Sequence, residues 1–228
     1  MAAQKSPFDL PDVSGLAVGF LGGTGDQGRG LARRLAMAGH RVLIGSRSEQ
    51  RAAAAAEGLG AGLPVRGLEN AAATREADVV IATVPWEGHR DLLASLSGEL
   101  AGKVVVDCVN PMGFDKQGAY ALPVPEGSAA EQAAALLPDS PVVAAFHHVS
   151  ATLLLDPEVD RVETDVLVLG DDREATDLVQ ALAGRIPGMR GVYAGRLRNA
   201  GQVEALTANL VSVNRRYKAH AGLRVTDV

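Results

Sequence analysis

The sequence predicts a doubly wound α/β fold with a mostly parallel sheet, and three observations support this prediction. Short apolar runs alternate with helix-like segments along most of the 228 residues. Apolar residues make up 47% of the chain and aromatic residues only 4%, so the core must consist of Ala, Val and Leu, which suits strands buried under helices. A glycine-rich loop directly follows the first apolar run.

The first half of the chain shows the alternation clearly. A strand at 16–21 and a run of glycines precede a helix whose apolar face contains Leu31, Leu35 and Ala38. Gly39 and His40 end that helix. The further elements expected here are a strand at 41–45, an alanine-rich helix at 49–57 and buried strands at 78–84 and 103–107.

The second half begins with residues 110–125, whose three prolines and two glycines indicate a loop long enough to suggest ligand contact. Ser128 and Glu131 form a capping box that starts a helix at 128–137. Strands at 142–146, 162–169 and 189–193 and helices at 172–183 and 199–217 follow. We therefore expect an extension outside the fold at 1–14, a sheet domain at 15–195 with a C-terminal strand-helix-strand extension, and a helical cap at 196–228.

Charge and composition argue against several classes of protein. The net charge of −5, with no basic block, gives no attraction to a nucleic-acid backbone. The longest apolar runs, such as 79–84, are far shorter than the roughly 20 residues of a membrane span. The N-terminus has no signal-peptide pattern, and the single Cys108 cannot form an internal disulfide. We expect a soluble protein of the reducing cytoplasm, without nucleic-acid or membrane partners.

A G-x-G-x-x-G pattern stands at 23–28, between the first strand and the first helix. The first glycine permits a tight turn, the second lets backbone amides approach a pyrophosphate, and the third permits close helix packing. The helix N-terminus then stabilises the anion. The prediction is a Rossmann-type dinucleotide site, and the alternative is a glycine-rich turn without a ligand. The cofactor-binding candidates of this loop are Gly23, Thr24, Gly25, Asp26, Gln27 and Gly28.

The end of the second strand selects the type of nucleotide. An NAD enzyme carries Asp or Glu there, about 20 residues after the loop, whereas this chain has Ser46 and Arg47. A guanidinium offers a planar fork of charged donors to a 2′-phosphate, so we predict NADP(H). Arg51 lies one helical turn further and either joins this phosphate site or is a solvated surface residue.

Residues just after the strands of an open parallel sheet line its ligand crevice. This rule selects 83–86, 108–111 and 147–151 for the nicotinamide side. Trp86 is the only tryptophan, and it either covers a planar ring or packs against the following helix. At most one of His147 and His148 can face the crevice, because neighbours in an extended chain point in opposite directions.

Other chemistry has little support in the sequence. We predict no metal site, because no Cys or further His stands at ligand spacing. Cys108 is interpreted as a small buried apolar residue and His40 as a structural one. The chain contains neither a Ser-His-Asp arrangement nor the Tyr-x-x-x-Lys pair of carbonyl reductases. Hydride exchange between two cofactors fits this composition, since it requires mainly positioning and the exclusion of water.

The segments LGGTGDQG, GSR, TVPWE and AFHHVSA together resemble those of the coenzyme F420-dependent NADP reductases. The segments at 124–131, 169–172 and 197–207 extend the resemblance from about residue 16 nearly to the C-terminus, and loop 110–125 resembles a bacterial subgroup. The resemblance implies direct, reversible hydride transfer between NADP(H) and the deazaflavin ring of F420, with the two rings stacked. We expect a homodimer.

The resemblance also assigns residues by matching position. It places the NADP contacts at Thr24 to Gln27, Ser46, Arg47, Arg51, Thr83, Val84 and Ala151. It places the deazaflavin contacts at His147, His148, Val149 and around Asn199, with the cap at 196–228 completing the pocket. The cofactor site also includes three residues that follow strand ends, Pro85, Trp86 and Asn110. The acidic F420 tail has two candidate partners, Arg198 and Lys218. The catalytic contribution of the protein is limited to assistance from His147 or His148.

Two other functions remain open at this point. An NADPH-dependent reductase of a small imine, carbonyl or metal substrate requires a positioned acid near the nicotinamide, and only His147 and His148 are available. A non-catalytic NADP(H) sensor binds the nucleotide without oxidising it.

Overall fold

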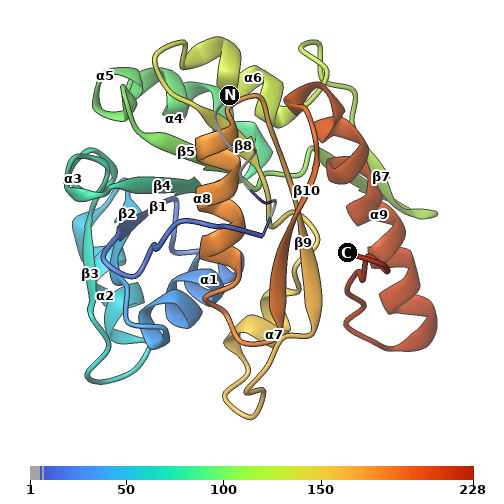
Figure 1. The fold of residues 1–228 in the computed structure, drawn as a ribbon, viewed down its shortest axis with the longest axis horizontal. Helices are drawn as coiled ribbons and strands as arrows, with labels where there is room; N and C mark the ends of the chain where they lie inside the picture. Colours follow the sequence, from blue (N-terminus) through green and yellow to red (C-terminus); the bar gives the residue numbers. More distant parts are fainter. Residues whose placement is uncertain (1–5, 7) are drawn as a thin grey trace.

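The computed structural model describes residue 6 and residues 8–228, which fold around one eight-stranded sheet (Figure 1). The strands lie in the order β10-β9-β8-β5-β4-β1-β2-β3, and all neighbours are parallel except β8 and β9. An antiparallel hairpin of β6 and β7 forms a separate small sheet. The strand bounds are β1 Ala17–Leu21, β2 Arg41–Ser46, β3 Val65–Glu69, β4 Val79–Ala82, β5 Val104–Asp107, β6 Met112–Asp115, β7 Gly118–Ala121, β8 Val142–Ala144, β9 Thr164–Gly170 and β10 Met189–Gly195.

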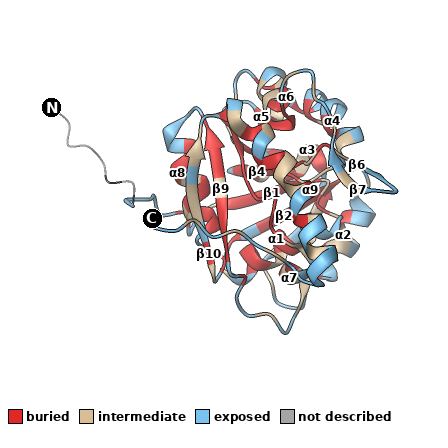
Figure 2. Cartoon of the chain, turned by 90° about the vertical axis from the view of Figure 1, so that its right-hand side faces the viewer, coloured by how far each residue is buried: buried red, intermediate tan, exposed pale blue. Residues whose placement is uncertain are grey.

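Helices cover both faces of the sheet, and the central strands between them are buried, whereas the edge strands β3 and β10 each have only one buried residue (Figure 2). One apolar cluster packs α1, α2, α7 and α8 against one face, and a second packs α3 to α6 and the start of α9 against the other. The helix bounds are α1 Asp26–Met37, α2 Glu49–Glu57, α3 Asn70–Glu76, α4 His89–Ser95, α5 Ser97–Leu100, α6 Ala129–Leu136, α7 Ala151–Leu155, α8 Arg173–Ala183 and α9 Ala200–Tyr217, with short 3-10 turns η1 Trp86–Gly88 and η2 Leu197–Asn199.

The predicted mostly parallel α/β sheet is confirmed, and Ser128 is the N-cap of α6 as predicted. Ser128 accepts a hydrogen bond from the Glu131 amide at 2.9 Å, and the Ser128 hydroxyl donates to the Glu131 carboxylate at 3.0 Å. The strand predicted at 142–146 ends earlier, at Ala144, because Phe146 takes a left-handed backbone with φ of 64°. This conformation turns the chain sharply just before His147.

The interpretation of 110–125 as an irregular loop was wrong over eight of its residues, which form the β6–β7 hairpin. The pattern gave no signal, because the hairpin is an exposed ribbon without a buried face: Phe114 is 68% and Tyr120 46% exposed. Asp115 stabilises the turn by accepting hydrogen bonds from the amides of Gln117 and Gly118.

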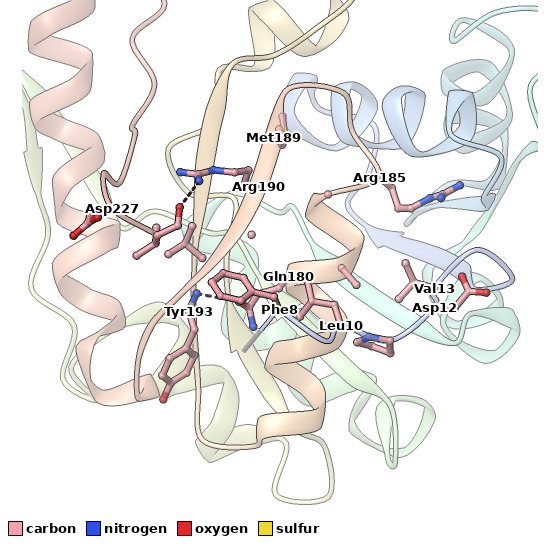
Figure 3. Close-up of a pocket in the computed structure, with 16 residues that line it drawn as sticks. Phe8, Leu10, Asp12, Val13, Gln180, Arg185, Met189, Arg190, Tyr193 and Asp227 are labelled. Carbon is pink, nitrogen blue, oxygen red and sulfur yellow. Dashed lines mark hydrogen bonds between the residues drawn. The ribbon is translucent and has the colours of Figure 1, made fainter. Parts of the chain in front are cut away.

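The stretch expected to lie outside the fold at 1–14 includes residues that the structure does not describe, but its end packs on the domain. Val13 is only 3% exposed. Phe8 and Leu10 line a cavity of about 800 Å³ together with Gln180 of α8 and Tyr193 of β10 (Figure 3). Within residue 6 and residues 8–228, no helix combines the length and apolar character that crossing a membrane requires.

Helix α7, which follows the sixth strand of the predicted series, is held against α1 by a buried arginine. Arg34 is 2% exposed and donates from its guanidinium to the carbonyls of Leu153, Leu154 and Asp156 at 2.7–3.1 Å. A Cβ at Gly30 would come within 2.6 Å of Leu154, so the glycine permits this close approach. These contacts fix the helix that follows segment 147–151.

Candidate functional site

The glycine loop has the geometry that binds a pyrophosphate. Gly22 has φ of +65° in the tight turn between β1 and α1, and the Gly23 amide donates to the Gly45 carbonyl at 3.0 Å, which ties this turn to the end of β2. A Cβ at Gly28 would lie 2.7 Å from the Gly23 Cα, so the third glycine allows α1 to pack on the turn. A Cβ at Gly25 would meet nothing within 4 Å, which leaves the turn open for a ligand.

The N-terminus of α1 is the anion-binding end of this loop. Gly25 is its N-cap and carries no side chain to accept from the first-turn amides. Thr24 is half-buried, and Asp26 is exposed and pairs with Arg29 at 3.4 Å. Gln27 donates to the Phe146 carbonyl at 3.3 Å, which ties the start of α1 to the segment before His147. The free amides of this turn can hold a phosphate.

The segment after β2 presents two cationic side chains. Ser46 is buried, and its hydroxyl accepts from the Ser48 amide at 3.3 Å. Ser48 caps α2, which begins at Glu49, so Arg47 lies just before the helix and Arg51 in its first turn, and both are exposed. Across the part of the chain that the structure describes, neither guanidinium has an ion-pair partner.

Asn70 is a contributor to this region that the sequence patterns did not select. It follows β3, is 7% exposed, and accepts a hydrogen bond from the Gly22 amide at 3.3 Å. A Cβ at Gly45 would lie 2.7 Å from its Oδ1. Asn70 therefore fixes the glycine turn from the side of β3, a strand that the sequence analysis also missed.

A cavity of about 190 Å³ brings three predicted strand-end segments together with the start of α1. Thr83 anchors one wall by donating to the Leu21 carbonyl at 2.9 Å. Val149, Ala151 and Asn199 do not line this cavity: Val149 packs in the core, Ala151 begins α7 and Asn199 caps α9. The lining residues are Gln27, Thr83, Val84, Pro85, Trp86, Cys108, Val109, Asn110 and His147.

The two adjacent histidines point in different directions, as predicted. His147 lines the cavity and is 4% exposed, and neither of its ring nitrogens has a hydrogen-bond partner among the residues that the structure describes. His148 packs toward β9, where its Nε2 accepts from the Leu167 amide at 3.4 Å. Burial lowers the pKa of each imidazole to about 4. Both are therefore neutral near pH 7, and His147 offers an unused donor and acceptor to a ligand.

Cys108 and His40 have the structural roles that were predicted. The Cys108 thiol is buried and donates to the Ala82 carbonyl at 3.0 Å. Burial, with a further contribution from the negative charge of Asp107, raises its pKa well above the ordinary value, so the thiol is not a nucleophile near neutral pH. His40 is buried, with Nδ1 3.1 Å from the Leu16 carbonyl oxygen.

A buried polar network behind the cavity escaped the sequence analysis. His89 of α4 and Asp107 of β5 are both 0% exposed, and His89 Nε2 lies 2.5 Å from the Asp107 carboxylate. His89 Nδ1 lies 3.1 Å from Oε1 of Gln132, whose amide nitrogen donates to Glu126. His89 thus faces an acceptor at each ring nitrogen, an arrangement that favours the doubly protonated ring. Burial opposes this charge, but Asp107 outweighs it and the pKa of His89 is raised.

This network supports two walls of the cavity. Asp107 Oδ1 accepts from the Val109 amide at 3.0 Å, which fixes the turn containing Cys108 and Val109. The His89 ring lies 5.5 Å from the Trp86 ring, centroid to centroid. Trp86 therefore packs on α4, as one of the two alternatives left open above expected, and it also lines the cavity. The sequence does contain a signal for Asp107, because an acidic residue there directly ends a run of apolar valines.

Helix α9 closes the cavity region from the C-terminal side. The side-chain Nδ2 of Asn110 donates to the His147 carbonyl at 2.8 Å. The Thr207 hydroxyl lies 3.3 Å from Asn110 Oδ1 and 3.2 Å from the same carbonyl. Glu204 lies one turn earlier and accepts from the amides of Ala129 and Ala130 at the N-terminus of α6. Burial raises the pKa of Glu204 to about 7.

Comparison with known proteins is consistent with this geometry. Residues 17–111 match the family model described as NADP oxidoreductase coenzyme F420-dependent. The chain is 40% identical to the F420-dependent NADP reductase of Methanothermobacter marburgensis, over 93% of this chain and 99% of that protein. It is 38% identical to the F420-dependent NADP reductase of Methanocaldococcus jannaschii, again over 93% of this chain and 99% of that protein. A solved structure of a putative F420-dependent NADP reductase from an Arthrobacter species matches with a TM-score of 0.80 and 26% identity, over 93% of this chain and all of the other. The chain belongs to the family of F420-dependent NADP reductases.

Proposed function

We propose that this protein catalyses reversible hydride transfer between NADP(H) and the deazaflavin coenzyme F420. The observation that carries the proposal is the cavity in which the start of α1, three strand ends and the unpartnered His147 ring meet. The relatives that cover nearly the whole chain are named for this reaction. Two electrons and the hydrogen pass together from one ring carbon to the other, so the protein needs to align the rings and exclude water.

The nucleotide side of the site follows from the β1–α1 turn and the end of β2. The amides of the first turn of α1 hold the pyrophosphate, while Ser46, Arg47 and Arg51 bind the 2′-phosphate. The nicotinamide enters the cavity beside Thr83 and Val84. In this proposal Thr24 to Gln27 and Ala151 complete the NADP contacts.

The deazaflavin lies on the other side of the cavity. Trp86, Pro85 and Asn110 form its walls, and His147 orients the ring by a hydrogen bond from a neutral imidazole. His148, Val149 and Asn199 support this side from positions outside the lining, and residues 196–228 complete the pocket through α9. The enzyme acts as a homodimer in the cytoplasm. Sedimentation of the purified protein tests whether it is a dimer.

Arg47→Ala should weaken NADPH binding about ten- to a hundredfold and leave NADH binding nearly unchanged. A hydrogen bond to a charged group contributes roughly 1.5–3 kcal/mol, and only NADPH has the 2′-phosphate that Arg47 contacts. Titration calorimetry with both nucleotides measures the two affinities. Arg41→Ala, at the exposed start of the strand β2 that precedes Arg47, is the matched control. Equal weakening of both nucleotides would contradict the assignment.

Direct transfer makes a second prediction. NADPH deuterated at carbon 4 on the transferred face should deliver its label to the deazaflavin ring carbon, which mass spectrometry of the product detects. His147→Ala should slow this reaction by roughly 10²–10⁴-fold at most, because positioning of the rings remains. Label in solvent, where the product does not exchange, would exclude direct transfer. A folded, NADP-binding His147→Ala variant without activity would instead favour an imine or carbonyl reductase that uses this histidine as its acid.

A further inference from the structure

A second groove lies between the β6–β7 hairpin and the C-terminal half of α9, two elements that run side by side (Figure 1). Its volume is about 610 Å³, more than three times that of the cavity at His147. Phe114 lines one side and is 68% exposed. The complete lining is Phe114, Asp115, Gln117, Gly118 and Ala119 from the hairpin and Val211, Ser212, Arg215 and Arg216 from α9.

The groove is cationic. Arg215 and Arg216 are both exposed, and within residue 6 and residues 8–228 neither forms an ion pair. Asp115 is the acidic residue of the lining, and its carboxylate already accepts from two amides of the hairpin turn. The two arginines also lie favourably in the last turn of α9, but a helix terminus does not explain why both border a groove.

Helix α9 connects this groove with the cavity at His147. Thr207, Val211 and Arg215 are spaced by four residues and share one face of the helix. Thr207 contacts Asn110 and the His147 carbonyl at the cavity, and Val211 and Arg215 line the groove. With a rise of about 1.5 Å per residue, Arg215 lies roughly 12 Å along the axis from Thr207. A ligand whose ring occupies the cavity can therefore extend a substituent into the groove.

We propose that this groove binds the anionic tail of the deazaflavin substrate, with Arg215 and Arg216 as the partners of its phosphate and glutamate carboxylates. The proposal rests on the proposed function, because it takes the deazaflavin ring to lie at His147. Guanidinium groups suit planar carboxylates and phosphates, and they offer several donors each. In this proposal Arg215 and Arg216 take the role predicted for Arg198, which lies on η2 and does not line the groove.

The test compares F420 with the tail-free deazaflavin alcohol, which has the same ring and sugar chain but no phosphate or glutamate. In Arg215→Ala/Arg216→Ala, KM and the dissociation constant from fluorescence titration should rise roughly two- to thirtyfold for F420, the range for two exposed charge pairs. Both constants should be unchanged for the alcohol. The effect should shrink as the ionic strength rises. The matched control, Arg66→Ala/Arg75→Ala, removes the same charge from β3 and α3, where both arginines are exposed.

Each outcome separates this proposal from the function on which it rests. Unchanged F420 constants in the groove variant, or equal losses for F420 and the alcohol, would overturn the tail site while the reductase function stands. If the control variant lost as much affinity for F420 as the groove variant, the effect would come from the net charge of the protein, and this result would also overturn the site. A wild-type protein that reduces neither deazaflavin with NADPH would overturn the proposed function itself.

Discussion

Replacing Asp107 with alanine is expected to lower the free energy of unfolding by about 3–5 kcal/mol. The substitution removes the carboxylate that faces the His89 ring, which is buried at 0% exposure and loses its hydrogen-bond acceptor and counter-ion, and removing one member of a buried pair costs about that much. The Val109 amide also loses its acceptor. Urea denaturation at pH 7 measures the change. Because the same turn forms a wall of the cavity, kcat should fall together with stability.

Three further variants separate the ion pair from other effects. Asp139→Ala removes an exposed carboxylate and should change stability by no more than about 0.5 kcal/mol. Asp107→Asn retains volume and an acceptor, so it should lose less than Asp107→Ala. His89→Leu/Asp107→Leu removes both charges and should be less destabilised than the sum of the single leucine variants. A loss below about 1 kcal/mol in Asp107→Ala would contradict the buried ion pair.

The sequence predicted those helices and strands whose periodic pattern of apolar residues matches the residues that are buried in the structure. Strands such as β4, with four fully buried residues, leave a continuous apolar run, and α9 has a long polar and apolar alternation. Strand β3 lies at the edge of the sheet with one buried residue among five, so it shows no apolar run. The hairpin strands contain no buried residue, and the hairpin is fixed by its contact with α9 rather than by an apolar pattern of its own.

The candidate site divides in the same way. Residues at strand ends are predictable, because parallel strands bring their carboxyl ends to one edge, and this rule selected most of the cavity lining. Asn70 and Glu204 could not be selected. Their roles arise from contacts with Gly22 and with the start of α6, which are 48 and 75 residues away in the sequence, and no local pattern records such distances.

Stability should fall as the pH falls from 6.5 to 4.5, and His147 and His148 should be the cause. In the unfolded chain a histidine gains its proton near pH 6.5, whereas burial lowers the pKa of both folded residues to about 4. The unfolded state therefore binds two more protons in this interval, which favours unfolding at the lower pH. Above pH 6.5 both states are neutral and the effect is absent. Each residue accounts for on the order of 3 kcal/mol over its full interval.

Glu204 opposes the histidines, and this opposition allows a decisive test. Its pKa rises from 4.5 to about 7 on folding, so the folded state holds the extra proton and stability from this group falls as the pH rises from 4.5 to 7. Together the three residues give the free energy of unfolding a net slope of roughly 1.4 kcal/mol per pH unit between pH 4.5 and 6.5.

Glu204→Gln should about double this slope, and His147→Gln/His148→Gln should reverse its sign. Urea denaturation at several pH values measures these slopes independently of each variant's absolute stability. Exposed carboxylates with a lowered pKa, such as Glu163, change stability only below about pH 4.5 and do not interfere. A histidine double variant that keeps the wild-type slope would show that these rings are not buried in the neutral form.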